Sequence, residues 1–198
     1  MSENENEAKG WKIVSEDVRY ETPWIRVSHH DVIAPTGAKG IYGCVHVKNI
    51  AVGMLPVDDE GHTWLVGQDR FPFQDYTWEL PQGGGNRAHT PLETAERELS
   101  EECNLAAENY LPLYENIMVS NCISDEIGYG YIAWGLSDRP GTLDDTEDLA
   151  VKRVPLTQVM DMIETGEIRD GFTILMMARA SLLAAKGKLP AEIAKYFL

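Results

Sequence analysis

Short runs of β-branched and aromatic residues predict strands over the first quarter of the chain. Two such runs occupy residues 12–14 and 24–27, and turn-forming residues follow each of them. Residues 41–47 alternate between apolar and polar positions, which predicts a returning strand. A segment of this size buries little surface alone, so we expect residues 11–48 to lean on the rest of the chain or on a second subunit.

A longer series of strand and helix patterns follows. Apolar runs at 50–56 and 63–68 predict two strands joined as a hairpin across the turn at 58–61. Later elements are predicted in this order: strands at 111–120, 129–134 and 151–154, then helices at 156–164 and 172–186. Strands flanked by few helices indicate an α/β protein with a mixed sheet between helices, an α/β/α sandwich.

The same pattern predicts how the chain divides. Residues 1–10 are polar and acidic, and we expect a disordered tail. Residues 11–48 form a small β segment, which is the expected dimerisation element. Residues 49–198 form the main domain.

A helix is predicted to begin at Pro91. Thr90 can cap it, Pro91 suits the first helical position, and Glu93 completes a capping box. The apolar residues that follow recur at spacings of three and four and form one stripe that can pack on a core: Leu92, Ala95, Leu99 and Cys103.

Three glutamates on this helix, Glu98, Glu101 and Glu102, form what we call the glutamate cluster. Glu98 and Glu102 are four residues apart, so they share a helix face and repel each other unless a cation lies among them. A hard divalent ion such as Mg²⁺ takes oxygen ligands and keeps waters for a phosphate substrate. The alternative for the bare motif is a solvated acidic helix face.

Composition excludes some classes of partner. The formal net charge is −15, which argues against a nucleic-acid backbone as ligand. A small anionic substrate stays possible, because a bound metal reverses the field inside a cleft. Three widely spaced cysteines suggest neither disulfides nor a zinc site. No apolar run reaches the ~18 residues of a membrane span, so we expect no membrane partner and a cytoplasmic location.

The stretch around the helix resembles the Nudix box, G-x5-E-x7-R-E-U-x-E-E-x-G-U, where U is a bulky aliphatic residue. The positions in register are Gly83, Arg97, Glu98, Leu99, Glu101, Glu102 and Leu105. His89 stands where the family has Glu, and Asn104 stands where it has Gly. Asn is the next-best residue for a left-handed helix cap, whereas a neutral His cannot pair with Arg97 as the Glu does.

Segments outside the box resemble the ADP-ribose-type enzymes of that family, and this resemblance implies roles for individual residues. The metal ligands would be the carbonyl of Gln82 with Glu98, Glu101 and Glu102. Catalysis would use Arg97 to orient carboxylates, with the proton accepted by a box glutamate or by a late-loop carboxylate, Glu147 first and Asp145 second. Substrate would contact Arg70, Trp24, Ser120 and Glu126.

Arg70 and the late loop each have an alternative interpretation without a functional role. Arg70 can be an exposed cation at a strand end, and residues 141–148 can be an acidic surface loop. His29 and His30 are adjacent, so they point to opposite faces of a strand, and we interpret both as ordinary strand residues.

The resemblance therefore implies a Mg²⁺-dependent hydrolase, with Mn²⁺ as second metal. It would cleave the pyrophosphate bond of a nucleoside diphosphate linked to another moiety, ADP-ribose or a nucleotide sugar, and would act as a homodimer. The alternative is a catalytically weak domain that binds a nucleotide or a protein, supported by His89 and by the altered loop at 120–126. A structural α/β protein would require the box to be accidental.

Overall fold

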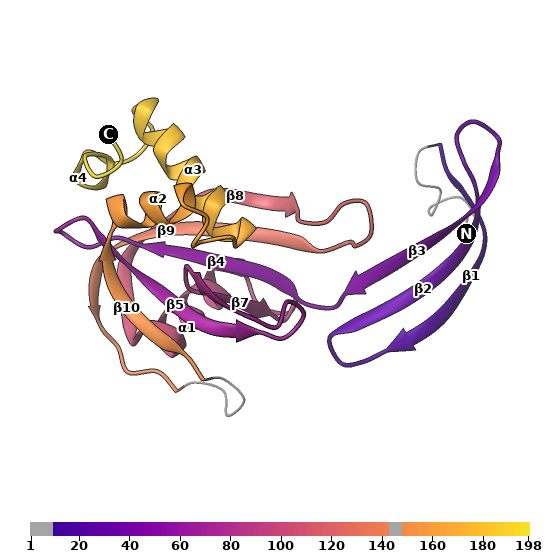
Figure 1. Ribbon diagram of the computed structural model, residues 1–198, viewed down its shortest axis with the longest axis horizontal. Coiled ribbons are helices and arrows are strands. Elements are labelled where there is room, and N and C mark those ends of the chain that lie inside the picture. The colour runs from indigo at the N-terminus through magenta and orange to yellow at the C-terminus, as the bar shows by residue number, and fades with distance from the viewer. Residues whose placement is uncertain (1–9, 143–147) are drawn as a thin grey trace. The chain divides into compact units, whose positions relative to one another are not determined.

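The structure is a computed structural model that describes residues 10–142 and 148–198 (Figure 1). Its contacts divide the chain into two compact units. The smaller unit comprises the described residues up to Ile50 together with Met118–Ile127, and the larger comprises Ala51–Ile117 and Gly128–Leu198. The tail predicted to be disordered lies outside the described residues, except for Gly10.

The smaller unit is built on one antiparallel sheet of three strands. The strands are β1 (Lys12–Glu21), β2 (Ile25–Ile33) and β3 (Lys39–Val47), in the order β1-β2-β3. The three strands predicted there are confirmed, although β1 runs seven residues beyond the apolar run that predicted it. Every residue of β1 is exposed, so this sheet has one strand with no buried side chain at all.

A second segment of the smaller unit, Met118–Ile127, lies against β3. The amide of Val45 donates to the carbonyl of Ile123 at 2.8 Å, and the amide of Asp125 donates back to Val45 at 3.2 Å. The hydroxyl of Tyr42 donates to the carbonyl of Cys122 at 2.6 Å. This segment supplies backbone partners to a strand that would otherwise be an open edge.

The larger unit contains two sheets. One has the order β10-β5-β6 and the other β7-β4-β9-β8, in which β4 and β9 are parallel. The strands are β4 (Ile50–Pro56), β5 (His62–Arg70), β6 (Asp75–Glu79), β7 (Gln82–Gly85), β8 (Leu105–Met118), β9 (Ile127–Asp138) and β10 (Ala150–Pro155). The turn at 58–61 forms, but the predicted hairpin pairing is wrong, because β4 and β5 lie in different sheets.

Four helices accompany these strands: α1 (Pro91–Cys103), α2 (Leu156–Glu164), α3 (Gly171–Ala185) and α4 (Ala191–Ala194). In Figure 1, α1 lies on one side of the strands of the larger unit, and α2, α3 and α4 lie on the other. The predicted α/β/α arrangement with a mixed sheet is confirmed. Both predicted C-terminal helices form with bounds that agree within one residue.

The hydrophobic core lies in the larger unit. It joins strand residues such as Leu55, Leu65 and Ile132 to helix residues such as Val159 and Met176, all fully buried. Among the described residues, no helix has the length and apolar character needed to cross a membrane.

Candidate active site

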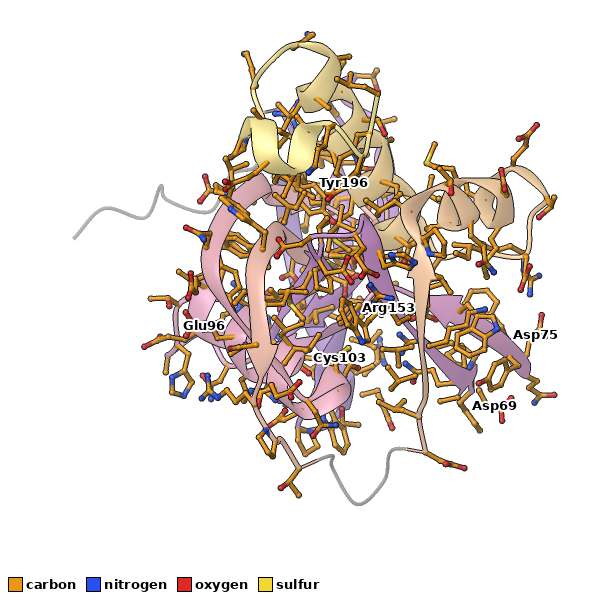
Figure 2. The ribbon with its side chains drawn as sticks, turned by 90° about the vertical axis from the view of Figure 1, so that its left-hand side faces the viewer. Asp69, Asp75, Glu96, Cys103, Arg153 and Tyr196 are labelled. Atoms are coloured by element: carbon orange, nitrogen blue, oxygen red, sulfur yellow. The ribbon has the colours of Figure 1, made fainter. Side chains whose placement is uncertain are left out.

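Helix α1 begins and ends as its sequence predicts. The Thr90 hydroxyl accepts the Glu93 amide and the Glu93 carboxylate accepts the Thr90 amide, which is a complete capping box. Asn104 ends the helix in the left-handed conformation, with φ 55°, so Asn serves at the place where the family has Gly. In Figure 2, Glu96 lies on the outer side of the larger unit and Cys103 lies toward its interior.

The glycines of β7 allow α1 to lie very close to this strand. A side chain at Gly83 would collide with the Glu98 carboxylate, and one at Gly85 would collide with Thr94. These two positions of the strand hold glycine because a helix packs directly on it. The Gln82 amide donates to Glu102 Oε2 at 2.9 Å, which places the Gln82 backbone beside the glutamate cluster.

Arg97 lies among the carboxylates and relieves their repulsion. Its guanidinium donates to Glu98 Oε1 at 2.5 Å, to the Gly84 carbonyl at 3.0 Å, and to Glu101. Burial alone would lower the pKa of Arg97, but the charges of Glu98 and Glu101 outweigh it and raise that pKa. Arg97 therefore orients two members of the cluster without a carboxylate at position 89.

A second arginine–glutamate pair lies at the start of this site. The Arg70 Nε donates to Glu79 Oε1 at 2.9 Å, while the same guanidinium also reaches the other carboxylate oxygen. The Gln82 side chain donates to Glu79 at 2.6 Å, and Thr77 donates as well. Burial would raise the pKa of Glu79, but these donors, Arg70 first, outweigh it and lower the pKa.

Arg70 is not the free strand-end cation that its position alone suggested. Its planar guanidinium is held by the buried carboxylate of Glu79. Its pKa is raised chiefly by the hydrogen bond to Glu79, and Asp170 and Glu102 add to that effect. The sequence did not single out Glu79. Its position in the segment immediately before the box was the signal that could have indicated a role.

The donor set suits a hard divalent cation. Glu98 and Glu102 are 7% and 4% exposed, so their charges require compensation. Among the described residues, Arg70 pairs with Glu79, and Arg97 pairs with Glu98 and Glu101. The carboxylate oxygens of the glutamate cluster fit Mg²⁺ or Mn²⁺.

The carboxylates of the glutamate cluster do not lie as close together as the ligands of one ion would. Within residues 10–142 and 148–198, one group of three His, Cys or acidic side chains has its ligand atoms all within 4.8 Å. That group is Glu16, His30 and His46, in the smaller unit. Arg97 instead holds Glu98 and Glu101, so metal binding there requires these carboxylates to turn from the guanidinium.

The remaining predicted site residues are divided between the parts of the chain. Trp24, Ser120 and Glu126 belong to the smaller unit, where Trp24 is 67% exposed. Burial raises the pKa of Glu126, so this carboxyl is more easily protonated than an exposed one. Glu147 and Asp145 lie outside the described residues.

Two families match this chain. The NUDIX domain family matches residues 47–173, and the nucleoside diphosphate sugar hydrolase N-terminal domain family matches residues 11–45. The first match covers more than half of the chain, so the chain belongs to the Nudix family.

Individual relatives narrow this class. The chain is 33% identical over 125 residues to an ADP-ribose pyrophosphatase of Bacillus subtilis, covering 62% of this chain and 67% of the relative. It is 32% identical over 127 residues to an ADP-ribose pyrophosphatase of Mycobacterium tuberculosis, covering 63% and 61%. The family match and these two relatives together identify the chain as a Nudix hydrolase.

A solved structure supports the fold independently of close sequence similarity. The crystal structure of an ADP compounds hydrolase superposes with a TM-score of 0.79 at 19% identity, covering 90% of this chain and 97% of the other. The two proteins share the same fold, and the resemblance inferred from the box residues is confirmed.

Proposed function

We propose that this protein hydrolyses the pyrophosphate bond of a nucleoside diphosphate linked to another moiety, with Mg²⁺ as cofactor and Mn²⁺ as a substitute. ADP-ribose is the first candidate substrate and a nucleotide sugar the second. The observation that carries this proposal is the close packing of α1 on β7, which gathers the glutamate cluster, Arg97 and the Gln82 backbone. The named relatives and the N-terminal family support the substrate class.

The metal would be held by Glu98, Glu101, Glu102 and the Gln82 carbonyl. When bound, it neutralises pyrophosphate charge and lowers the pKa of a water. Arg97 orients Glu98 and Glu101 and also donates to the Gly84 carbonyl, and with a cation bound the two carboxylates would turn from the guanidinium. Glu101 is the most exposed of the three, with a side chain 31% exposed, so it is the box glutamate best placed to exchange a proton with water.

Arg70 would bind a phosphate of the substrate. Its side chain is 37% exposed, and its hydrogen bonds to Glu79 use the Nε and Nη2 atoms of the guanidinium. The buried carboxylate fixes the plane of the group, and a planar donor with a free edge binds phosphate oxygens in a defined orientation. Glu147 remains the proposed late carboxylate, with Asp145 second.

A metal-dependent activity screen tests the proposal. Hydrolysis of ADP-ribose and a panel of nucleotide sugars is measured with Mg²⁺ and with Mn²⁺, together with the metal-induced rise in Tm. Glu102→Gln should lose about 100-fold or more in kcat/KM and most of the Tm gain, because it removes a buried ligand. Glu96→Gln, on the outer side of the same helix, is the matched control and should retain both. An unchanged metal response in Glu102→Gln would overturn the assignment.

A second candidate function is a nucleotide- or protein-binding module with weak turnover. His89 favours it, since it stands where the family has a carboxylate, and the altered loop at 120–126 favours it as well. The screen separates the two. Saturable nucleotide binding with no metal-dependent turnover on any substrate of the panel would favour the binding module.

We also propose that the protein is a homodimer built partly by residues 11–48. Large apolar side chains of that segment are exposed, among them Val14 at 64%, Tyr20 at 58% and Ile41 at 71%. Exposed apolar surface of this extent on one sheet is typical of an interface. The division into a β segment at 11–48 and a hydrolase domain at 49–198 belongs to this proposal, and the cytoplasmic location stays a prediction.

A further inference from the structure

Three potential metal ligands come together on one face of the small sheet. Glu16 lies on β1, His30 on β2 and His46 on β3, and one ligand atom of each lies within 4.8 Å of the others. Glu16 is the cross-strand partner of His30. His46 pairs with Arg26, which shares a face of β2 with Ser28 and His30 because side chains alternate along a strand.

A buried hydroxyl joins the two imidazoles. Ser28 Oγ lies 2.7 Å from His30 Nε2 and 2.8 Å from His46 Nε2, so both rings converge on one point. Ser28 is 1% exposed and His30 is 8% exposed. A hydroxyl has one proton, so it can donate to only one of the two nitrogens and must accept from the other.

The carboxylate of Asp125 fixes the tautomer of His46. Its Oδ2 lies 2.8 Å from His46 Nδ1, so in the neutral imidazole that nitrogen carries the hydrogen and Nε2 carries the lone pair. Asp125 Oδ1 also accepts the Val47 amide at 2.9 Å, which holds the carboxylate in place. A carboxylate on the far nitrogen of an imidazole is the arrangement that orients histidine ligands in metal sites.

One ring nitrogen of His30 lacks a hydrogen-bond partner. With His46 Nε2 accepting from Ser28, His30 Nε2 donates to Ser28, and its Nδ1 lone pair is left. That Nδ1 is buried and has no hydrogen-bond partner. A buried polar atom without a partner is uncommon and calls for a ligand or an explanation.

We propose that Glu16, His30 and His46 bind one divalent transition-metal ion of the Zn²⁺ class. Two imidazoles and one carboxylate are a three-ligand set that Zn²⁺ accepts with water in the fourth position. Mg²⁺ is disfavoured here, because it prefers oxygen donors in octahedral geometry. The site is made wholly from the smaller unit and uses no residue of the glutamate cluster.

Two neighbouring groups bear on this assignment. Arg26 approaches Glu16 at 3.6 Å, but both side chains are about two-fifths exposed, so the pair is weak and a metal can displace it. Ser28, His46 and Asp125 also have the order of a nucleophilic triad. With 1% exposure, Ser28 cannot reach a substrate, so this order serves to orient His46.

An open cavity of about 330 Å³ gives an ion a route to the two histidines. Its lining includes His30 and His46 together with Trp11, Val32, Tyr42 and Cys44. The cavity lies on the same strand face as the three ligands, because Val32, Cys44 and Tyr42 continue the alternation of His30 and His46.

The test measures Zn²⁺ binding while Mg²⁺ saturates the glutamate cluster. Chelator-treated full-length protein in millimolar Mg²⁺ is titrated with Zn²⁺ against a fluorescent chelator, and bound zinc is counted by elemental analysis. We expect one Zn²⁺ per chain in the wild type and in Glu102→Gln. His46→Gln and Glu16→Gln should each weaken binding about 100-fold, and Asp125→Asn about 10- to 100-fold.

The matched control is His29→Gln, since His29 is adjacent to His30 but points to the opposite face. It should bind Zn²⁺ as the wild type does. Glu16 is exposed, so Glu16→Gln tests the site even if His46→Gln fails to fold. The proposal is overturned if the wild type binds no zinc. It is overturned as well if Glu102→Gln abolishes all the zinc binding of the wild type, because the zinc would then lie at the glutamate cluster. It is also overturned if Glu16→Gln and His46→Gln are folded by circular dichroism and bind zinc as His29→Gln does.

Discussion

The two units of this protein cover their apolar side chains to very different degrees. In the larger unit, β4 is buried at six of seven residues, and helices lie on both sides of its strands. In the smaller unit, β1 is exposed at all ten residues and the sheet has a single layer. The larger unit therefore carries its own stability, while the smaller one is suited to be completed by something else, a second subunit, a metal ion or both.

The same substitution should cost different amounts of stability in the two units. Val52→Ala removes two methyl groups from the closed core of the larger unit and should cost about 2–3 kcal/mol in the free energy of unfolding. Val32→Ala in the smaller unit should cost about 1 kcal/mol, because Val32 borders an open cavity and its truncation creates little new enclosed space. Urea unfolding measures both. Equal costs would show that the smaller unit is as well packed as the larger.

A charge placed on the exposed face of the small sheet should break the proposed dimer. Ile41→Asp should raise the dimer dissociation constant by about 30- to 1,000-fold, which corresponds to about 2–4 kcal/mol at an interface hot spot. Leu182→Asp is the control, because Leu182 is 44% exposed on α3 of the larger unit and should leave the mass unchanged. Light scattering that finds a wild-type monomer at micromolar concentration would refute the dimer.

Buried and exposed arginine–glutamate pairs of the larger unit should differ in stability and in pH dependence. Glu79→Gln should cost about 1–3 kcal/mol near neutral pH, because Arg70 loses a buried partner. Glu60→Gln, in the exposed pair with Arg153, should cost less, because solvent screens that pair.

The pH profile follows from the lowered pKa of Glu79. A carboxyl whose pKa is lower in the folded state stabilises the fold above its unfolded pKa of about 4.3, and that stabilisation is lost as the pH falls through the folded value. The gap between wild type and Glu79→Gln should therefore close on acidification below about pH 4. A gap that stays constant down to pH 2 would contradict the role given to Arg70.

The smallest effect is expected at position 89. His89→Glu should raise kcat/KM by about tenfold or less, at the lower end of what outer-shell support of metal ligands contributes. The reason is that Arg97 already donates to Glu98, Glu101 and the Gly84 carbonyl. A gain of 100-fold or more would mean that Arg97 is poorly held during the reaction.

The parts of the site that the sequence predicted well are those whose partners lie close in the chain. The capping box joins Thr90 to Glu93, and Arg97 meets Glu98 and Glu101, all within one helix. Spacings of three and four residues bring side chains together on a helix, so periodicity is informative for the capping box and for Arg97 with Glu101. The fold class followed from the same kind of local pattern.

The parts that escaped prediction depend on pairing between distant strands. The turn at 58–61 was visible, but the partners of β4 and β5 are set by the sheet order, which no local signal gives. His30 was interpreted as an ordinary strand residue because Glu16 and His46 lie on neighbouring strands, at no characteristic spacing. Glu79 was missed because its partner Arg70 is nine residues away across a strand pair.

The contact between β3 and Met118–Ile127 delays the folding of the small sheet until a distant segment has been synthesised. Tyr42 and His46 find partners at Cys122 and Asp125, which are 80 and 79 positions further along the chain. At about 5–20 residues per second, a ribosome makes that stretch in about 4–16 s. For those seconds β3 lacks the segment that pairs with it, so its edge is open to pairing with other chains. The small sheet is complete only when the segment between β8 and β9 has been made. A chain truncated before Met118 would therefore leave the edge of β3 unpaired.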